Sequence, residues 1–166
     1  MSPLPLRPNV GACLFNRDGL VLVARRADQP AGEADLGAWQ LPQGGLDPGE
    51  DPQAAVLREL SEEIGTRNAR VVGRMSEWLD YDLPAHLVGK ALGGKYRGQT
   101  QMWFALRFLG EDAEIRLDAD AHREFDAWRW APLAELPAIA VAFRRPIYER
   151  LARDFAPYAV PVAVGG

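Results

Sequence analysis

Three glutamates near the middle of the chain have the spacing of a metal-binding cluster. Glu59, Glu62 and Glu63 stand at positions i, i+3 and i+4, which would place their carboxylates on one face of an α-helix. Such like charges repel one another without a cation, whereas oxygen ligands converging on one point are what Mg²⁺ or Mn²⁺ requires. An isolated Glu-x-x-Glu-Glu is more commonly a charged solvent face, so the surrounding residues must decide.

A glycine-rich segment precedes these glutamates, and a helix must carry them. Residues 44–50 read Gly-Gly-Leu-Asp-Pro-Gly-Glu, and such glycines let the backbone turn tightly and approach a metal ion or a phosphate. Asp51 and Pro52 are typical of a helix start, and Gly65 of a helix end. Apolar residues at mostly helical spacing predict that this helix buries one side and exposes the acids on the other.

The chemistry that such a cluster supports is attack on a polyphosphate. Divalent ions neutralise phosphate charge and lower the pKa of a bound water, and a carboxylate can accept the water proton. The sequence leaves this base open between Glu59, Glu63 and Glu124. A di-iron carboxylate site is disfavoured because it needs Glu-x-x-His pairs, and neither His86 nor His122 follows a glutamate by three residues.

The run from residue 44 to residue 66 resembles the Nudix box. That pattern is Gly, five residues, Glu, seven residues, Arg-Glu, an aliphatic residue, any residue, Glu-Glu, any residue, Gly and an aliphatic residue. Every fixed position matches, and Thr66 departs only at the final aliphatic site. The resemblance implies an α/β fold, the Nudix α/β/α sandwich with a mixed β-sheet. It also implies metal binding and catalysis by the following residues: Glu59, Glu62 and Glu63 as metal ligands, Gly44 through its backbone, and Glu50 with Arg58 as a supporting salt bridge.

Segments outside the box resemble one Nudix subfamily, the bacterial RNA pyrophosphohydrolases and the similar asymmetric dinucleoside tetraphosphate hydrolases. The resemblance extends over residues 7–155, and it is carried by residues 7–11, 24–26, 39–45, 81–84, 98–104 and 124–130. It implies an additional metal ligand at Glu124. It also implies a set of residues that hold the substrate end, with arginines facing phosphates or a base and aromatic rings offering stacking faces. These are Arg7, Arg26, Gln43, Tyr81, Phe143 and Arg144.

Length, charge and composition limit the remaining possibilities. The 166 residues fit a single domain over positions 1–166, with residues 1–6 and 157–166 expected as loose tails. No stretch approaches the length of a membrane span, which favours a cytoplasmic protein without a membrane partner. A formal net charge of −4 argues against duplex DNA as a partner. The lone Cys13 lies in an apolar run, where a buried thiol is expected.

The pattern of apolar residues predicts strands alternating with helices. A hairpin is expected from strands at 10–15 and 20–24, followed by a loop at 27–38 and a short strand at 39–41. Further strands are expected at 71–78, 101–108 and 125–130, with a long loop at 81–98 and a last helix at 146–155. This order predicts a mixed sheet covered on both faces.

Three functions fit these residues. The first is a hydrolase that removes pyrophosphate from triphosphorylated RNA 5′ ends with Mg²⁺, or with Mn²⁺. The second is hydrolysis of diadenosine tetraphosphate to ATP and AMP. The third is an inactive nucleotide-binding regulator, which is disfavoured because Glu59, Glu62 and Glu63 are all present. The sequence leaves open the oligomeric state, the number of metal ions, the preferred 5′ nucleotides and any activating partner.

Overall fold

A mixed β-sheet forms the centre of the computed structural model, which describes residues 4–27, 39–118 and 124–162. Five strands follow the order β3-β2-β1-β7-β5, while β4, β6 and β8 pair with β1, β7 and β2. The strand bounds are β1 (Leu6–Phe15), β2 (Val21–Arg26), β3 (Trp39–Gln40), β4 (Gln43–Gly45), β5 (Ala69–Arg74), β6 (Leu79–Asp82), β7 (Gly98–Phe108) and β8 (Phe125–Ala131). Most of the expected loop at 27–38 lies outside the described residues.

The two central strands are parallel. β1 and β7 pair along almost their whole length, from Leu6 opposite Gly98 to Phe15 opposite Arg107. All other strand pairs are antiparallel. The β1–β2 hairpin turns as expected, because Asn16 Oδ1 accepts hydrogen bonds from two backbone N–H groups of the turn and Gly19 takes a positive φ of 81°. The predicted mixed sheet is confirmed.

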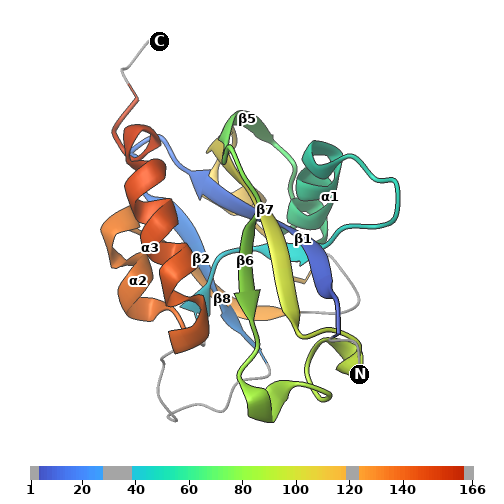
Figure 1. Cartoon of the computed structure of the whole chain (residues 1–166). Coiled ribbons are helices and arrows are strands. Elements are labelled where there is room, and N and C mark those ends of the chain that lie inside the picture. Colours follow the sequence, from blue (N-terminus) through green and yellow to red (C-terminus); the bar gives the residue numbers. More distant parts are fainter. Residues whose placement is uncertain (1–3, 28–38, 119–123, 163–166) are drawn as a thin grey trace.

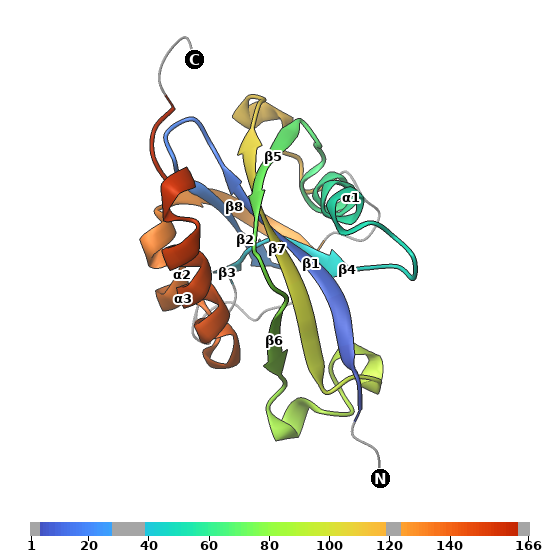
Figure 2. The same ribbon diagram turned by 45° about the horizontal axis from the view of Figure 1, so that its top comes forward.

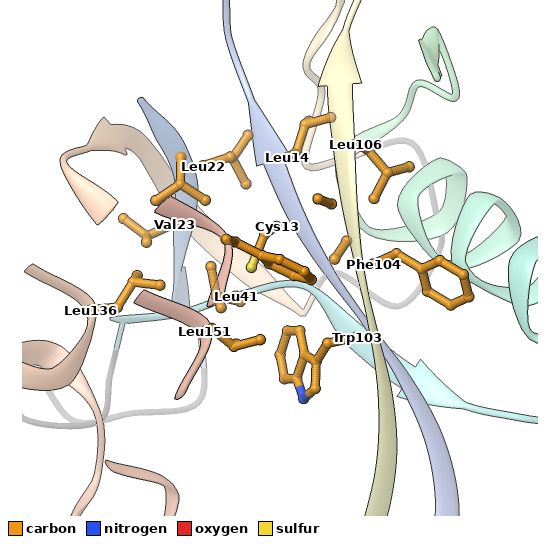
Figure 3. Packing of buried hydrophobic residues seen from close by; sticks show 14 of the residues in the cluster. Cys13, Leu14, Leu22, Val23, Leu41, Trp103, Phe104, Leu106, Leu136 and Leu151 are labelled. Carbon is orange, nitrogen blue, oxygen red and sulfur yellow. The ribbon is translucent and has the colours of Figure 1, made fainter. Parts of the chain in front are cut away.

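Helices cover both faces of this sheet. α1 (Pro52–Ile64) lies on one side of the strands, and α2 (Leu136–Ile139) and α3 (Arg145–Asp154) lie on the other (Figures 1 and 2). Neighbouring β7 residues serve the two layers, since side chains alternate along a strand. Trp103 packs edge-on against Tyr148 of α3, whereas Phe104 points toward α1 (Figure 3). Among the described residues no helix is long and apolar enough to cross a membrane.

The helix that carries the glutamates begins and ends where the sequence predicts. Asp51 Oδ2 accepts a hydrogen bond of 3.0 Å from the backbone N–H of Ala54, and Gly65 closes the helix with a φ of 75°. The expected exposure of the acids is wrong for two of them. Glu59 and Glu63 are buried on the same helix face as Leu60, and only Glu62 is exposed. The reason is that this face packs toward β4 and β1 and not toward solvent.

Several element bounds differ from the sequence expectation. The expected strand at 71–78 is found as β5 and ends at Arg74. The next strand, β6, extends into the first residues of the expected loop at 81–98. Tyr81 therefore lies in a strand paired with β7, and the loop that follows contains two short 3₁₀ turns, η1 (Ala85–Leu87) and η2 (Leu92–Gly94). The elements that the sequence analysis did not anticipate are β4, α2 and the 3₁₀ turns η3 (Asp112–Glu114), η4 (Leu133–Glu135), η5 (Ala142–Arg144) and η6 (Ala156–Tyr158).

The end of the chain is held against the first hairpin. The Arg107 guanidinium donates hydrogen bonds to the carbonyl oxygens of Asn16 at 2.7 Å and Tyr158 at 3.0 Å. The backbone N–H of Val162 donates to Arg17 O at 2.9 Å. Residues 157–162, expected as part of a loose tail, thus have defined contacts, while residues 163–166 lie outside the described part of the chain.

Candidate active site

One cavity of about 600 Å³ is lined by both acidic and cationic residues. Its walls come from β1, β2, β3, β4, β7 and α1, together with the segments before β8 and α3. The residues that line it are Arg7, Asn9, Arg26, Ala27, Gln40, Gln43, Gly44, Gly45, Glu59, Glu62, Leu92, Gln99, Glu124 and Arg144. Eight residues that the sequence analysis selected are in this set: Arg7, Arg26, Gln43, Gly44, Glu59, Glu62, Glu124 and Arg144.

Arg58 organises the acidic side of the cavity. Its Nε and Nη2 donate to the two carboxylate oxygens of Glu50, each at 2.9 Å, and Nη2 also donates to the carbonyl of Gly45 at 3.1 Å. Its Nη1 donates to Glu59 at 3.0 Å and to Glu62 at 3.3 Å. One guanidinium therefore connects the glycine-rich loop to two of the three helix glutamates, and paired bonds of this kind fix geometry as well as charge.

Burial changes the acidity of two helix glutamates. Removal from water raises the pKa of Glu59 to about 7, although the neighbouring Arg58 acts in the opposite direction. Burial also raises the pKa of Glu63, and the negative charge of Glu124 adds to this effect. Both carboxylate oxygens of Glu63 are buried without a hydrogen-bond partner of good geometry in the part of the chain described. A buried carboxyl group in this state is costly unless a cation or a donor is supplied.

Gly44 leaves room for one of these carboxylates. A side chain at this position would overlap the carboxyl group of Glu59, so glycine is what allows this carboxyl group to lie against β4. Gly45 has the same relationship to the guanidinium of Arg7 on the opposite side of the strand. The two glycines therefore let β4 approach an acidic side chain on one face and a cationic side chain on the other.

Glu59, Glu63 and Glu124 lie near enough to influence one another, but their carboxylates do not converge on a common point. Within residues 4–27, 39–118 and 124–162, no three His, Cys, Asp or Glu side chains are gathered tightly enough to hold a metal ion. Glu124 is exposed at the cavity wall, near enough to raise the pKa of both Glu59 and Glu63 by its charge.

Arg144, on the cationic side, packs against a pair of aromatic rings that also contact each other. The guanidinium carbon of Arg144 lies 5.7 Å from the ring centroid of Tyr81 and 5.7 Å from that of Phe143. The two rings are themselves 5.6 Å apart. Arg144 Nη1 donates to Gln40 Oε1 at 2.9 Å. The structure thus brings together three residues that are far apart in the sequence, although Tyr81 and Phe143 stand behind the cavity wall.

A row of buried amides lines the floor between the two sides. Gln99 Nε2 donates to the hydroxyl of Tyr81 at 2.6 Å, and its Oε1 accepts from Arg7 at 3.4 Å. Asn9, Gln99 and Gln101 are each 1% exposed. These three residues and Gln40 were not predicted as site residues from the sequence. Amides inside otherwise apolar strands nevertheless indicate a polar site, because buried polar groups need hydrogen-bond partners.

Comparison with known proteins agrees with this geometry. Residues 5–151 match the family model described as NUDIX domain. The chain is similar to the RNA pyrophosphohydrolase of Gluconacetobacter diazotrophicus, with 59% identity over 162 residues, covering 96% of this chain and 97% of the relative. It is also similar to the RNA pyrophosphohydrolase of Acidiphilium cryptum, with 62% identity over 158 residues, covering 95% and 94%.

Solved structures share the fold. The MutT protein from Methanosarcina mazei superposes with a TM-score of 0.64 at 22% identity, covering 93% of this chain and 99% of that one. The Escherichia coli dihydroneopterin triphosphate pyrophosphohydrolase gives a TM-score of 0.64 at 20% identity, covering 92% and 99%. With the family model matched over most of its length and relatives of more than half identity, the chain belongs to the Nudix hydrolase family.

Proposed function

We propose that this enzyme removes pyrophosphate from triphosphorylated RNA 5′ ends and leaves a monophosphate. The observation that carries the proposal is that one cavity holds two groups of side chains: Glu59 and Glu62 of α1, called here the acidic half, and Arg7, Arg26 and Arg144, called the cationic half. A 5′ triphosphate is an anion. Its cleavage needs metal-binding carboxylates near the reactive phosphorus and hydrogen-bond donors near the outer phosphate oxygens. The names of the similar relatives from Gluconacetobacter and Acidiphilium support the same substrate.

The acidic half suits a divalent cation, which Nudix enzymes typically require. Both carboxylate oxygens of Glu63 lack a hydrogen-bond partner among the described residues, and a hard cation would supply one. Gly44 leaves space beside the carboxyl group of Glu59. Glu59, Glu62, Glu63 and Glu124, with the backbone of Gly44, would hold Mg²⁺ or Mn²⁺. When bound, the ion offsets phosphate charge and makes a water molecule more acidic.

The protein's own residues supply positioning and proton transfer. Arg58 orients Glu59 and Glu62 and keeps the loop from residue 45 to residue 50 against the helix. One carboxylate among Glu59, Glu63 and Glu124 accepts the proton of the attacking water. Leu60 and Ile64 are buried beside these glutamates and fix the rotation of the helix.

The cationic half suits the end of a single RNA strand. Arg7 and Arg26 offer donors for phosphate oxygens, and the planar guanidinium of Arg144, supported from behind by Tyr81 and Phe143, offers a flat face for an unstacked base. Gln43 adds an amide between the two halves. Only the strand end enters such a cavity, so the net charge of −4 is compatible with an RNA substrate.

Analysis of products tests the proposal. Triphosphorylated RNA carrying an unpaired 5′ end is incubated with Mg²⁺, and the RNA end and the released phosphate species are identified. We expect 5′-monophosphorylated RNA with pyrophosphate for the wild-type protein, and almost none with a chelator or with Glu63→Gln. An inactive nucleotide-binding regulator would give no product in either protein, and a diadenosine tetraphosphate hydrolase would instead convert that dinucleotide to ATP and AMP.

A further inference from the structure

Gln101 is a buried amide whose orientation is fixed by a neighbour on the same strand. Its Oε1 accepts a hydrogen bond of 3.1 Å from the indole Nε1 of Trp103, and indole nitrogen can only donate. The amide nitrogen of Gln101 must therefore point the other way, toward the cavity floor. There it donates to Asn9 Oδ1 at 3.0 Å and to Gln43 Oε1. Gln101 itself is 1% exposed and is not part of the cavity wall.

Gln43 stands between two groups that both donate. On one side is the amide nitrogen of Gln101, and on the other is the guanidinium of Arg144. If the Gln43 amide turned over, its oxygen would lie 3.1 and 3.2 Å from the two terminal nitrogens of Arg144. Its nitrogen would then face the nitrogen of Gln101, which has no lone pair to offer. The bond to Trp103 thus favours the orientation in which the Gln43 NH₂ group faces Arg144.

Arg144 is held in place from the opposite direction. Gln40 accepts a hydrogen bond from its Nη1 at 2.9 Å, and the rings of Tyr81 and Phe143 pack against its guanidinium. Its Nε is buried without a hydrogen-bond partner in the described residues. Two fixed donor groups, on Gln43 and Arg144, consequently lie next to each other in the cavity wall. An acceptor oxygen between them would satisfy both, and a phosphate or a base carbonyl provides such an oxygen.

We propose that Gln101 is a positioning residue for substrate binding, because it holds the Gln43 amide with its NH₂ group turned toward Arg144. The inference rests on the proposed function only in taking an anionic nucleotide as the ligand. Without the donor at residue 101, the Gln43 oxygen turns to Arg144 and the two groups satisfy each other. The substrate then loses two donors in the ground state and the transition state alike, which raises KM and leaves kcat nearly unchanged.

The test compares Gln101→Met, a neutral side chain of similar length, with the wild type on triphosphorylated RNA. We expect KM to rise by roughly tenfold, the loss associated with a hydrogen bond to a charged group, while kcat stays within about twofold. Trp103→Phe removes the indole donor without altering Gln101 and should raise KM in the same direction. Thr100→Val is the matched control, since Thr100 is the adjacent β7 residue and bonds to Asp80 on the other face.

A double-mutant cycle separates positioning from a general packing role. If Gln101 acts through Gln43, then Gln101→Met causes little further rise in KM in a Gln43→Met background. An equal rise in both backgrounds, or an unchanged KM in Gln101→Met, overturns the inference. Should the wild type cleave only diadenosine tetraphosphate, the proposed function fails and the same cycle is run on that substrate. If it cleaves neither, dissociation constants for ATP replace KM.

Discussion

The α-carbon of Gly44 faces the carboxyl group of Glu59 so closely that a side chain at residue 44 would occupy the same space. Gly44 is fixed by its pairing with Val10 of β1, and Glu59 is fixed by the buried face of α1. The central sheet therefore sets the position of a proposed metal-binding carboxylate through direct contact. This relationship makes the activity sensitive to a change of one methyl group.

Gly44→Ala should lower kcat by about 100-fold, because a displacement of about 1 Å at a reacting group has an effect of that order. Its melting temperature should fall only modestly, since the Glu59 carboxyl group can move toward the cavity. Gly49→Ala is the control: its φ of 78° strains an alanine, but nothing lies within 4 Å of the added methyl group. Similar loss of activity in both variants would show that any disturbance of the glycine-rich loop, and not the position of Glu59, is responsible.

Glu63→Gln should separate activity from stability. The substitution replaces a buried carboxyl group, whose ionisation is opposed by burial and whose oxygens lack partners among the described residues, with a neutral amide. At a pH where unfolding lets this group ionise, the metal-free variant should therefore melt at a higher temperature than the wild type. Activity with Mg²⁺ should fall by at least about 100-fold, as expected for loss of a general base or a metal ligand. Calorimetry in a chelator gives the first value and RNA turnover gives the second. A lower melting temperature would mean that Glu63 has a stabilising partner as a carboxylate.

The stability of the metal-free protein should depend on pH through Glu59. Its pKa is raised from 4.5 to about 7 by burial, so the folded state favours the neutral form. The contribution of neutral Glu59 to the stability of the folded state is therefore complete below about pH 4.5 and is lost as the pH rises through about 7. The difference in melting temperature between wild type and Glu59→Gln should therefore shift against the wild type across that interval. A constant difference in the presence of a chelator would contradict the burial of this carboxyl group.

Cys13 should be unreactive in the folded protein. Burial in the core raises its pKa far above that of a free thiol, so the nucleophilic thiolate is not formed at neutral pH. Ellman's reagent at pH 8 should detect no thiol in the native state and one thiol per chain in guanidinium. Rapid labelling of the native protein would show that β1 opens locally or that Cys13 is accessible.

The sequence predicted those parts of the fold that depend on local signals. The caps at Asp51 and Gly65, the hairpin turn at Asn16 and the mixed sheet all follow from residue types and spacing. The burial of Glu59 and Glu63 did not, because helical periodicity places the acids on one face but does not say what that face meets. Tyr81 was assigned to a loop because Gly and Lys follow it, whereas pairing with β7 makes it a strand residue.

The candidate site was predictable by composition and less so by arrangement. The Nudix box identified the acidic half, and the flanking segments identified Arg7, Arg26 and Arg144 in the cationic half. The amides at Asn9, Gln99 and Gln101 received no role, because their partners come from strands distant in the sequence. Only the parallel pairing of β1 with β7 brings those residues together.

The most direct test of the account compares two substrates. Initial rates with Mg²⁺ are measured for triphosphorylated RNA with an unpaired 5′ end and for diadenosine tetraphosphate at equal concentrations, and kcat/KM is obtained for each. The proposed function predicts a kcat/KM for RNA that is at least tenfold higher, about 1.4 kcal/mol of preference. A higher value for the dinucleotide would contradict the assignment and would mean that the cationic half holds a second nucleoside.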